Sequence, residues 1–319
     1  MKVFRFSILI ITILIFSYCK KEKKTVVETD KKNTIIGFNQ NWSLFPPLTP
    51  ALMNNTLLLK PQMIRYPGGT ITYSWDWRTG TKIGGNPLLA HPVEDLKTLQ
   101  ANTDVQYVFV LDILNKTIND QIEMLSAIQN LGINIGYIEL GNELYLPQVD
   151  FVTVFPTGTE YAIKANIWMA QLKNVFPKAK ISVVLQCRDE NSVNTRLNEW
   201  NAKVIAAINN TIDAFTYHIY IPPGGNFAAR KKDFEGVVNT TNTGNKELWI
   251  TEYGNQNDTT EVNYYRSLDS LADYIENYPK VTIALNHLIS GSIRGKISKD
   301  GNSFTTEGKL FLTRAEKKK

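Results

Sequence analysis

Eight short apolar segments recur along this 319-residue chain, and helix-length segments separate most of them. Apolar runs of roughly four to eight residues are typical of buried parallel strands. Strands that alternate with helices form βαβ units and therefore a parallel sheet. The strand-like segments are residues 35–39, 63–66, 107–112, 137–143, 181–187, 214–220, 248–253 and 281–288.

The segments between the strands carry helix signals. Thr117 fits an N-cap and Gly132 lies just past the end of the helix that it would begin. Eight strand–helix units in roughly 260 residues fit a closed α/β barrel, the (β/α)₈ TIM barrel, better than an open sheet. We predict this barrel over residues 34–290, with 291–319 as a short C-terminal extension and no complete second domain. The predicted helices are residues 93–100, 118–131, 160–176, 195–208 and 263–278.

The formal net charge of +5 comes from the two ends of the chain. Residues 1–32 and 316–319 hold eleven of the 35 basic residues and four of the 30 acidic ones. The body between them therefore carries 24 basic and 26 acidic residues and is nearly neutral. A nucleic-acid-binding protein would show a basic body, so no nucleic acid partner is expected.

The first 19 residues have the layout of an export signal. Lys2 and Arg5 precede an apolar stretch, 7–16, that is too short for a comfortable membrane span of about 20 residues. Cys19 follows, and the whole resembles a bacterial lipoprotein signal peptide that is cleaved before a cysteine that is then acylated. An ordinary signal peptide and an uncleaved anchor are the alternatives.

Each of these alternatives exports the protein. We therefore expect residues 1–19 to be a signal peptide with Cys19 as the acylation site, and residues 20–33 to be a polar, lysine-rich tether. The expected location is the outer membrane or cell surface as a lipoprotein, or the secreted fraction. Contact with the membrane would then run through the N-terminal lipid alone, and the oligomeric state stays open.

Two of the strand-like segments end in a carboxylate. Glu143 closes the fourth segment, and Glu252 lies 109 positions later in the seventh, followed by an aromatic residue and a glycine. Barrel enzymes place their chemistry at the carboxyl ends of the strands. Two carboxylates delivered from different strand ends are what cleavage of a glycosidic bond requires.

This pattern resembles the large clan of retaining (β/α)₈ glycoside hydrolases. In that clan a strand-four Asn-Glu pair and a strand-seven Glu are the signature. The resemblance implies that Glu143 is the acid/base, that Glu252 is the nucleophile and that Asn142 contacts the sugar 2-hydroxyl. The implied substrate is a poly- or oligosaccharide.

The second strand narrows the resemblance. Residues 65–70, Arg-Tyr-Pro-Gly-Gly-Thr, are similar to a segment of α-L-arabinofuranosidases and of the related heparanase and β-glucuronidase-like families. Those families add a C-terminal β-sandwich, for which the residues after the eighth strand are too few, so the sequence is either truncated or a minimal barrel. Arg65 can hold the nucleophile ionised and oriented. Trp75 and Trp77 offer flat faces for stacking on a sugar, with packing between barrel and helices as the alternative.

Other strand ends carry further candidates for substrate contacts. His218 and Tyr220 share one face of the sixth strand because side chains alternate with period two. We predict that Tyr220 bonds the nucleophile and that His218 makes a contact with substrate or with the residues around it. Asn39, at the end of the first strand, is a weaker candidate. So are Asn286 and His287, near the end of the eighth.

The sequence gives no signal for a cofactor or metal. The three histidines, His91, His218 and His287, are isolated in sequence, and no two have metal-ligand spacing. No glycine-rich segment has the pattern of a phosphate loop. The predicted activity is therefore that of an exported retaining glycoside hydrolase without cofactors. The alternative is a surface barrel that binds glycan and cleaves it weakly or not at all.

Overall fold

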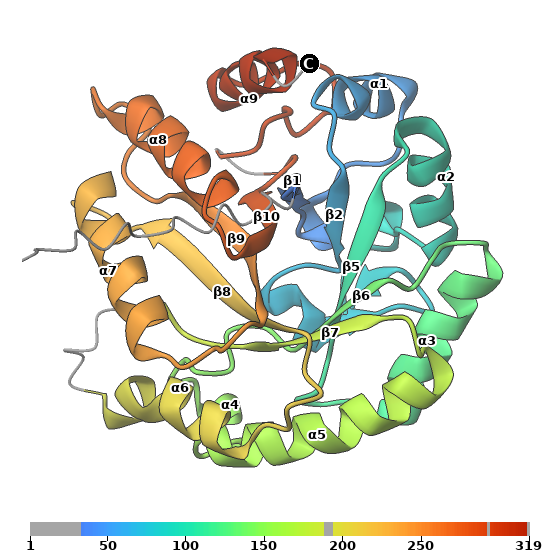
Figure 1. Ribbon diagram of the computed structural model, residues 1–319. Helices are drawn as coiled ribbons and strands as arrows, with labels where there is room; N and C mark the ends of the chain where they lie inside the picture. The colour runs from blue at the N-terminus through green and yellow to red at the C-terminus, as the bar shows by residue number, and fades with distance from the viewer. Residues whose placement is uncertain (1–32, 188–193, 292–293, 318–319) are drawn as a thin grey trace, which may run out of the picture. The chain divides into compact units, whose positions relative to one another are not determined.

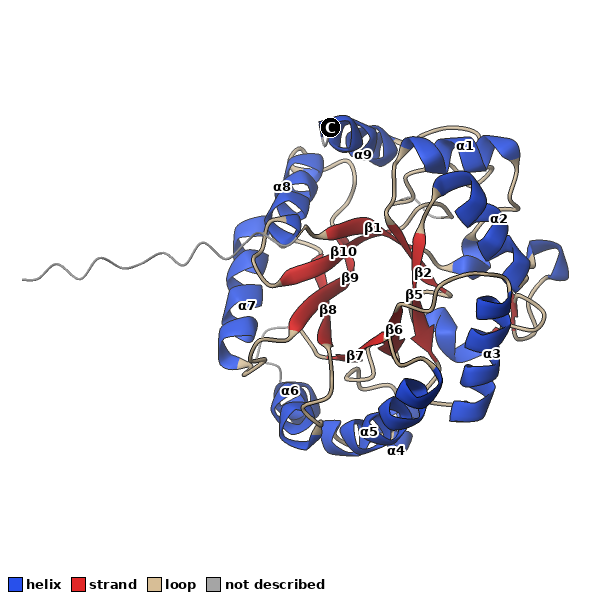
Figure 2. Ribbon diagram, turned by 45° about the vertical axis from the view of Figure 1, so that its right-hand side comes forward, coloured by secondary structure: helices blue, strands red, loops and turns tan. Residues whose placement is uncertain are grey.

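The computed structural model describes residues 33–187, 194–291 and 294–317, and these contain a closed barrel of eight parallel strands. Figure 2 shows the strands as a ring with the helices outside it. Neighbours in the ring are also neighbours in chain order, and β10 closes it against β1. The barrel strands are β1 (Ile35–Asn39), β2 (Met63–Tyr66), β5 (Gln106–Leu111), β6 (Tyr137–Leu140), β7 (Lys180–Val184), β8 (Ala214–Ile221), β9 (Glu247–Asn255) and β10 (Val281–His287).

Helices follow the strands around the outside of the barrel (Figure 1). They bury an apolar side against the strands, and this joint surface is the main hydrophobic core. The helices are α1 (Pro50–Leu58), α2 (Val93–Thr103), α3 (Ile118–Asn130), α4 (Val149–Val154), α5 (Gly158–Val175), α6 (Thr195–Ala207), α7 (Phe227–Thr240), α8 (Tyr264–Glu276) and α9 (Thr306–Lys317). A small hairpin of β3 (Trp75–Asp76) and β4 (Thr81–Lys82) lies in the segment after β2.

The predicted TIM barrel is confirmed. The strands predicted at residues 35–39 and 63–66 have the bounds that the structure shows, and the others differ at their ends. The largest difference matters for the chemistry, because β6 ends at Leu140 and Glu143 lies three residues beyond it. The apolar run alone does not reveal this early end, since Gly141 and Asn142, which follow the strand, are also buried.

The helix predictions hold with small shifts, and the N-cap at Thr117 is present. The Thr117 side chain accepts a hydrogen bond from the Asp120 backbone N–H, and Gly132 follows α3 with a φ of 83°. Thr157 and Glu160 form a capping box at the start of α5. These caps satisfy backbone donors that a helix leaves open at its first turn.

Helix α9 was not predicted and lies in the segment that the sequence analysis treats as an extension. Phe311 of α9 is 6% exposed and packs edge-on against Phe38 of β1, with ring centroids 5.7 Å apart. Lys296 and Glu307, both buried, form an ion pair at 2.8 Å beside it. The eighth helix of the barrel therefore follows residue 290, and helices α1, α4 and α7 are likewise additions to the predicted set.

In the part of the chain that the structure describes, no helix combines the length and apolarity needed to cross a bilayer. Cys19, the predicted signal peptide and most of the predicted tether lie outside the described residues.

Candidate active site

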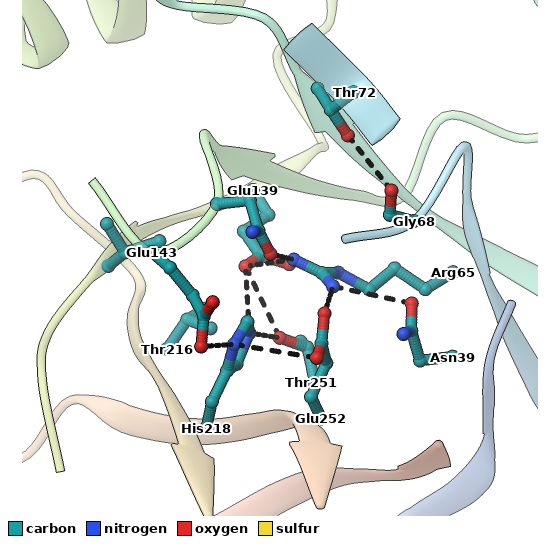
Figure 3. Close-up of polar contacts among 12 residues, drawn as sticks. Asn39, Arg65, Gly68, Thr72, Glu139, Glu143, Thr216, His218, Thr251 and Glu252 are labelled. Atoms are coloured by element: carbon teal, nitrogen blue, oxygen red, sulfur yellow. Dashed lines mark hydrogen bonds and ion pairs between the residues drawn. The ribbon is translucent and has the colours of Figure 1, made fainter. Parts of the chain in front are cut away.

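The barrel closes around a buried arginine at its carboxyl end. Arg65 of β2 is fully buried, and its guanidinium lies between Glu139 of β6 and Glu252 of β9 (Figure 3). Because β1, β2, β6 and β9 are parallel, their inward-facing side chains converge at one end of the barrel. The side chains around Arg65 therefore come from separate strands that lie far apart in the sequence.

Each of the five N–H groups of Arg65 has an acceptor. Nε and Nη2 donate to the two oxygens of Glu139, each at 2.9 Å. Nη2 also donates to Asn142 Oδ1 at 2.9 Å. Nη1 donates to Glu252 Oε1 at 2.5 Å and to Asn39 Oδ1 at 3.3 Å. A guanidinium with every donor used has one fixed orientation, so Arg65 sets the position of the carboxylate of Glu252.

Glu252 is held as an ionised carboxylate. Its Oε1 accepts from Arg65 and its Oε2 accepts from the Tyr220 hydroxyl at 2.7 Å. Burial alone would raise the pKa of Glu252, but His218, Arg65 and the Tyr220 hydrogen bond outweigh it and hold that pKa well below its usual range. A buried, oriented and ionised carboxylate is chemically suited to act as a nucleophile.

Glu143 reaches the site from an unusual backbone conformation. Its φ is 45°, in the left-handed region that side chains with a Cβ rarely adopt. Gly141 before it has a φ of 91°, and a Cβ there would lie 2.6 Å from a Leu144 methyl carbon. This tight turn directs the Glu143 side chain toward His218 of β8, while Tyr145 OH donates to Glu143 Oε1 at 3.1 Å. Strain of this kind is characteristic of functional positions.

Glu143 and His218 are placed to share one proton. Thr251 Oγ1 donates to Glu139 at 3.3 Å, so it accepts from His218 Nε2–H at 3.1 Å. The other ring nitrogen, Nδ1, lies 3.2 Å from Glu143 Oε1, and a hydrogen bond there requires one proton between the two atoms. Burial lowers the pKa of His218, but the negative charges of Glu252 and Glu143 more than compensate and raise it. The pair therefore keeps a proton next to the reaction site.

The two candidate catalytic carboxylates lie on the same side of the barrel end. His218 Nδ1 is 3.2 Å from Glu143 Oε1 and 3.8 Å from Glu252 Oε2. These two contacts place the two oxygens at most 7.0 Å apart, the sum of the two distances. Figure 3 shows His218 between both carboxylates.

Two asparagines named from the sequence also lie in the site. Asn142 is 1% exposed, and its amide accepts from Arg65 and donates to Thr70 Oγ1 at 3.4 Å. Its backbone is fixed by the Tyr73 hydroxyl, which donates to Asn142 O at 2.7 Å. Asn39 is fully buried, and its Nδ2 lies 2.7 Å from His287 Nδ1. The structure therefore brings most of the residues named from the sequence together in one polar network.

The two tryptophans lie elsewhere. Trp75 is 4% exposed, donates to the Tyr66 hydroxyl at 2.9 Å and packs edge-on against that ring. Trp77 is partly buried and stacks under the Arg78 guanidinium, whose centre lies 4.3 Å from its ring. Trp75 thus contacts Tyr66 of β2, and Trp77 contacts Arg78, whose guanidinium pairs with Asp120 and Glu123 of α3. Their placement favours the packing alternative over the predicted stacking on sugar.

Sequence reasoning missed Glu139, the main partner of Arg65. The available signal was a charged residue in the middle of a buried strand. Glu139 lies two positions before Gly141 and therefore on the same face of the chain. His287, at the end of β10, was only a weaker candidate in the sequence, and no partner for it could be predicted. Its ring lies edge-on to the Tyr220 ring at 6.0 Å, next to the nucleophile. Thr251 and Tyr73 had no signal in the sequence.

Within the described residues, no group of three or more histidine, cysteine, aspartate or glutamate side chains is arranged to hold a metal ion. The carboxylates of the site are instead engaged by Arg65, Tyr220 and His218. The chemistry that these groups can perform is proton transfer and nucleophilic attack.

Comparison with known proteins agrees with this chemistry. Residues 159–303 match a family model described as the glycosyl hydrolase catalytic core. The chain carries a glycoside hydrolase catalytic core. The matched region of this core includes Glu252 and His218 and begins after Glu143, so the position of Glu143 rests on the structure.

Solved structures share the barrel of this catalytic core. An α-L-arabinofuranosidase from Thermotoga maritima, in complex with arabinose, has a TM-score of 0.66 and 15% identity, covering 90% of this chain and 70% of that one. A family 51 α-L-arabinofuranosidase from Bifidobacterium longum has a TM-score of 0.69 and 12% identity, covering 89% and 73%.

A barrel of another specificity is also similar. An endo-β-1,3-glucanase from Sorangium cellulosum has a TM-score of 0.56 and 14% identity, covering 87% of this chain and 97% of that one. At these identities the likeness shows the fold. No curated protein sequence matched this chain.

Proposed function

We propose that this protein is an exported retaining glycoside hydrolase that cleaves O-glycosidic bonds of a poly- or oligosaccharide. Glu143 is the acid/base and Glu252 the nucleophile. The observation that carries the proposal is the environment of the two carboxylates. Glu252 is held ionised by Arg65 and Tyr220, whereas Glu143 lies against His218, with which it can exchange a proton. One carboxylate that stays ionised and one carboxyl group that can give and take a proton are the requirement for this reaction.

In the first step, a carboxylate oxygen of Glu252 attacks the anomeric carbon, and the bond from that carbon to the leaving oxygen breaks. Glu143 gives its proton to the leaving oxygen, and a covalent glycosyl–enzyme ester forms. Arg65 keeps its orientation throughout, because four of its five hydrogen bonds do not involve Glu252.

In the second step, Glu143 is the base. It takes a proton from water, the water oxygen attacks the anomeric carbon, and Glu252 leaves as a carboxylate.

The separation of the carboxylates supports retention of configuration. Retaining enzymes hold their carboxyl groups about 5–5.5 Å apart, and inverting enzymes about 6.5–9.5 Å apart. The upper bound of 7.0 Å between Glu143 Oε1 and Glu252 Oε2 leaves out most of the inverting range.

The test is hydrolysis of a panel of 4-nitrophenyl glycosides and of polysaccharides by the purified protein. The panel includes α-L-arabinofuranosides and β-1,3-glucan because proteins of similar fold carry those names. Glu252→Gln should lower kcat by at least about 10³-fold, since it removes the nucleophile and leaves its shape. Proton NMR of the first-formed sugar should show the configuration of the substrate, and the opposite anomer would refute retention.

Binding without cleavage is the competing function. In that case the parent protein and Glu252→Gln would retain the same polysaccharide in affinity electrophoresis and release no sugar from any member of the panel. The intact pair of carboxylates supports hydrolysis over this alternative.

Export is proposed from the first 19 residues alone. If Cys19 is acylated, a bacterium that expresses the full chain and is fed radiolabelled palmitate should yield a labelled protein in its membrane fraction. Cys19→Ala should be unlabelled. A protein that remains in the cytoplasm of the expressing cell would refute both export and the proposed cell-surface or secreted location.

A further inference from the structure

His287, at the carboxyl end of β10, is a site residue to which the proposed mechanism gives no role. Its backbone is fixed twice, by pairing of β10 with β1 opposite Asn39 and by Lys296, whose Nζ donates to His287 O at 2.9 Å. Its ring lies edge-on to Tyr220, which bonds the nucleophile Glu252. The ring is therefore held beside the tyrosine that orients the nucleophile.

A chain of hydrogen bonds assigns the proton on the His287 ring. Arg65 can only donate, so the Asn39 oxygen must face Arg65 Nη1. The Asn39 amide nitrogen then faces His287 Nδ1 at 2.7 Å, and because that nitrogen can only donate, Nδ1 must accept. A neutral imidazole carries one proton, so in His287 it is on Nε2.

The electrostatics agree with a neutral ring. Burial lowers the pKa of His287 and Glu252 opposes it, but Lys296 and Arg65 add to the lowering, and the pKa lies at about 4. His287 is thus uncharged at neutral pH. It offers one directional donor and no positive charge.

The Nε2–H group has no hydrogen-bond partner within the described residues. The Nε2 atom is not fully buried, and His287 as a whole is only partly buried. Nε2 therefore remains open to a ligand. In contrast, both ring nitrogens of His91 and of His218 have protein partners.

We propose that His287 Nε2–H donates a hydrogen bond to a hydroxyl of the sugar unit that is attacked by Glu252, and that Arg65 and Asn39 fix the tautomer that makes this possible. The proposal rests on the proposed function. The oxygen of a sugar hydroxyl can accept such a hydrogen bond.

The tautomer can be tested without any substrate. The full-length protein labelled with ¹⁵N-histidine contains three imidazoles, and His287→Gln assigns one of them by its absence. The His287 signals should show the Nε2–H tautomer and stay constant from pH 5 to 8. An Nδ1–H tautomer, or a titration in that range, would overturn the proposal.

Asn39→Asp tests the positioning role of the amide. A carboxylate there can accept from both Arg65 and His287, so the proton should move to Nδ1 and leave Nε2 as an acceptor. A simple structural role for Asn39 predicts no such exchange. If the Nε2–H tautomer persists in Asn39→Asp, the relay is refuted.

The substrate contact is tested by kinetics on the best 4-nitrophenyl glycoside of the panel and on its monodeoxy analogues. His287→Ala should lower kcat/KM about 2- to 10-fold on the parent glycoside and leave it unchanged on one deoxy analogue. His91→Gln, a buried histidine outside the site, should leave the ratios between glycosides as they are. Equal losses on every glycoside would refute the His287 contact while the hydrolase stands. A parent protein inactive on the entire panel would refute the proposed function itself.

Discussion

Arg65 and Glu139 form a two-point ion pair inside the barrel, with both side chains fully shielded from solvent. Glu139 contacts no leaving group in the proposed reaction, so its role is to hold Arg65. Arg65 in turn orients Glu252 and, through Asn39, His287. One buried guanidinium thus places both the nucleophile and a candidate donor to the sugar.

Glu139→Gln should destabilise the protein strongly. The change leaves Arg65 buried with one formal charge partner fewer, and loss of one member of a buried pair costs roughly 3–5 kcal/mol. We expect the lower end, about 3 kcal/mol, because Glu252 still faces Arg65. The free energy of unfolding from urea titration measures it.

The matched control is Glu123→Gln. Glu123 pairs with Arg78 at 2.7 Å, but their side chains are 60% and 46% exposed. An exposed pair is worth about 0–1 kcal/mol, so this variant should unfold almost as the parent does. Equal costs at the two positions would show that burial of the Arg65 pair is not what matters.

The acid limb of kcat/KM should lie below the ordinary range of a glutamate. The working form of Glu252 is ionised, and its depressed pKa keeps it ionised until the pH falls through that low value. Tyr220→Phe removes one of the groups that lower this pKa, so its acid limb should move to higher pH. If the acid limb lies at the same pH in parent and variant, Tyr220 does not lower the pKa of Glu252.

The backbone of Glu143 predicts an order of stabilities. Both Glu143→Ala and Glu143→Gly remove the acid/base and should lower activity on unactivated glycosides by about 10²–10⁴-fold. Glycine adopts a φ of 45° without strain, whereas alanine does not. Glu143→Gly should therefore be more stable than Glu143→Ala by about 1 kcal/mol in thermal or urea unfolding. The reverse order would contradict the left-handed conformation.

Asp112, at the end of β5, should reduce stability at neutral pH. It is 2% exposed, its Oδ2 has no hydrogen-bond partner in the described structure, and burial raises its pKa to about 6. The folded state thus binds a proton that the unfolded state releases near pH 4, and ionisation above pH 6 costs about 3 kcal/mol.

Asp112→Asn should therefore be more stable than the parent at pH 7.5 and closer to it near pH 4. Its amide oxygen can still accept from the Leu114 and Asn115 backbone N–H groups, as Asp112 Oδ1 does. Urea titrations at the two pH values measure the difference. A stability gap that does not change with pH would show that ionisation of Asp112 carries no penalty.

Trp75→Phe tests the packing role of that ring. The indole N–H donates to the Tyr66 hydroxyl within the core, so its loss should cost about 1–2 kcal/mol of unfolding free energy. KM for the best glycoside should stay within about 2-fold. A large rise in KM with unchanged stability would restore the predicted stacking on sugar.

The sequence by itself determined the barrel and several details of its elements. Strands 35–39 and 63–66 and the cap at Thr117 follow from apolar period, helix length and capping chemistry. These signals depend on residues a few positions apart, so they can be read along the chain. The sequence also named Glu143 and Glu252, because strand-end carboxylates are conspicuous within apolar runs.

Only the tertiary structure decided which side chains act together. The acceptors of Arg65 lie between 26 and 187 positions from it, and Asn39 meets His287 across 248 positions. Such contacts exist only once the barrel has closed and β1 pairs with β10. The role of Glu139, the proton on His287 and the packing of Trp75 depend on direction and distance between strands, which local sequence patterns do not contain.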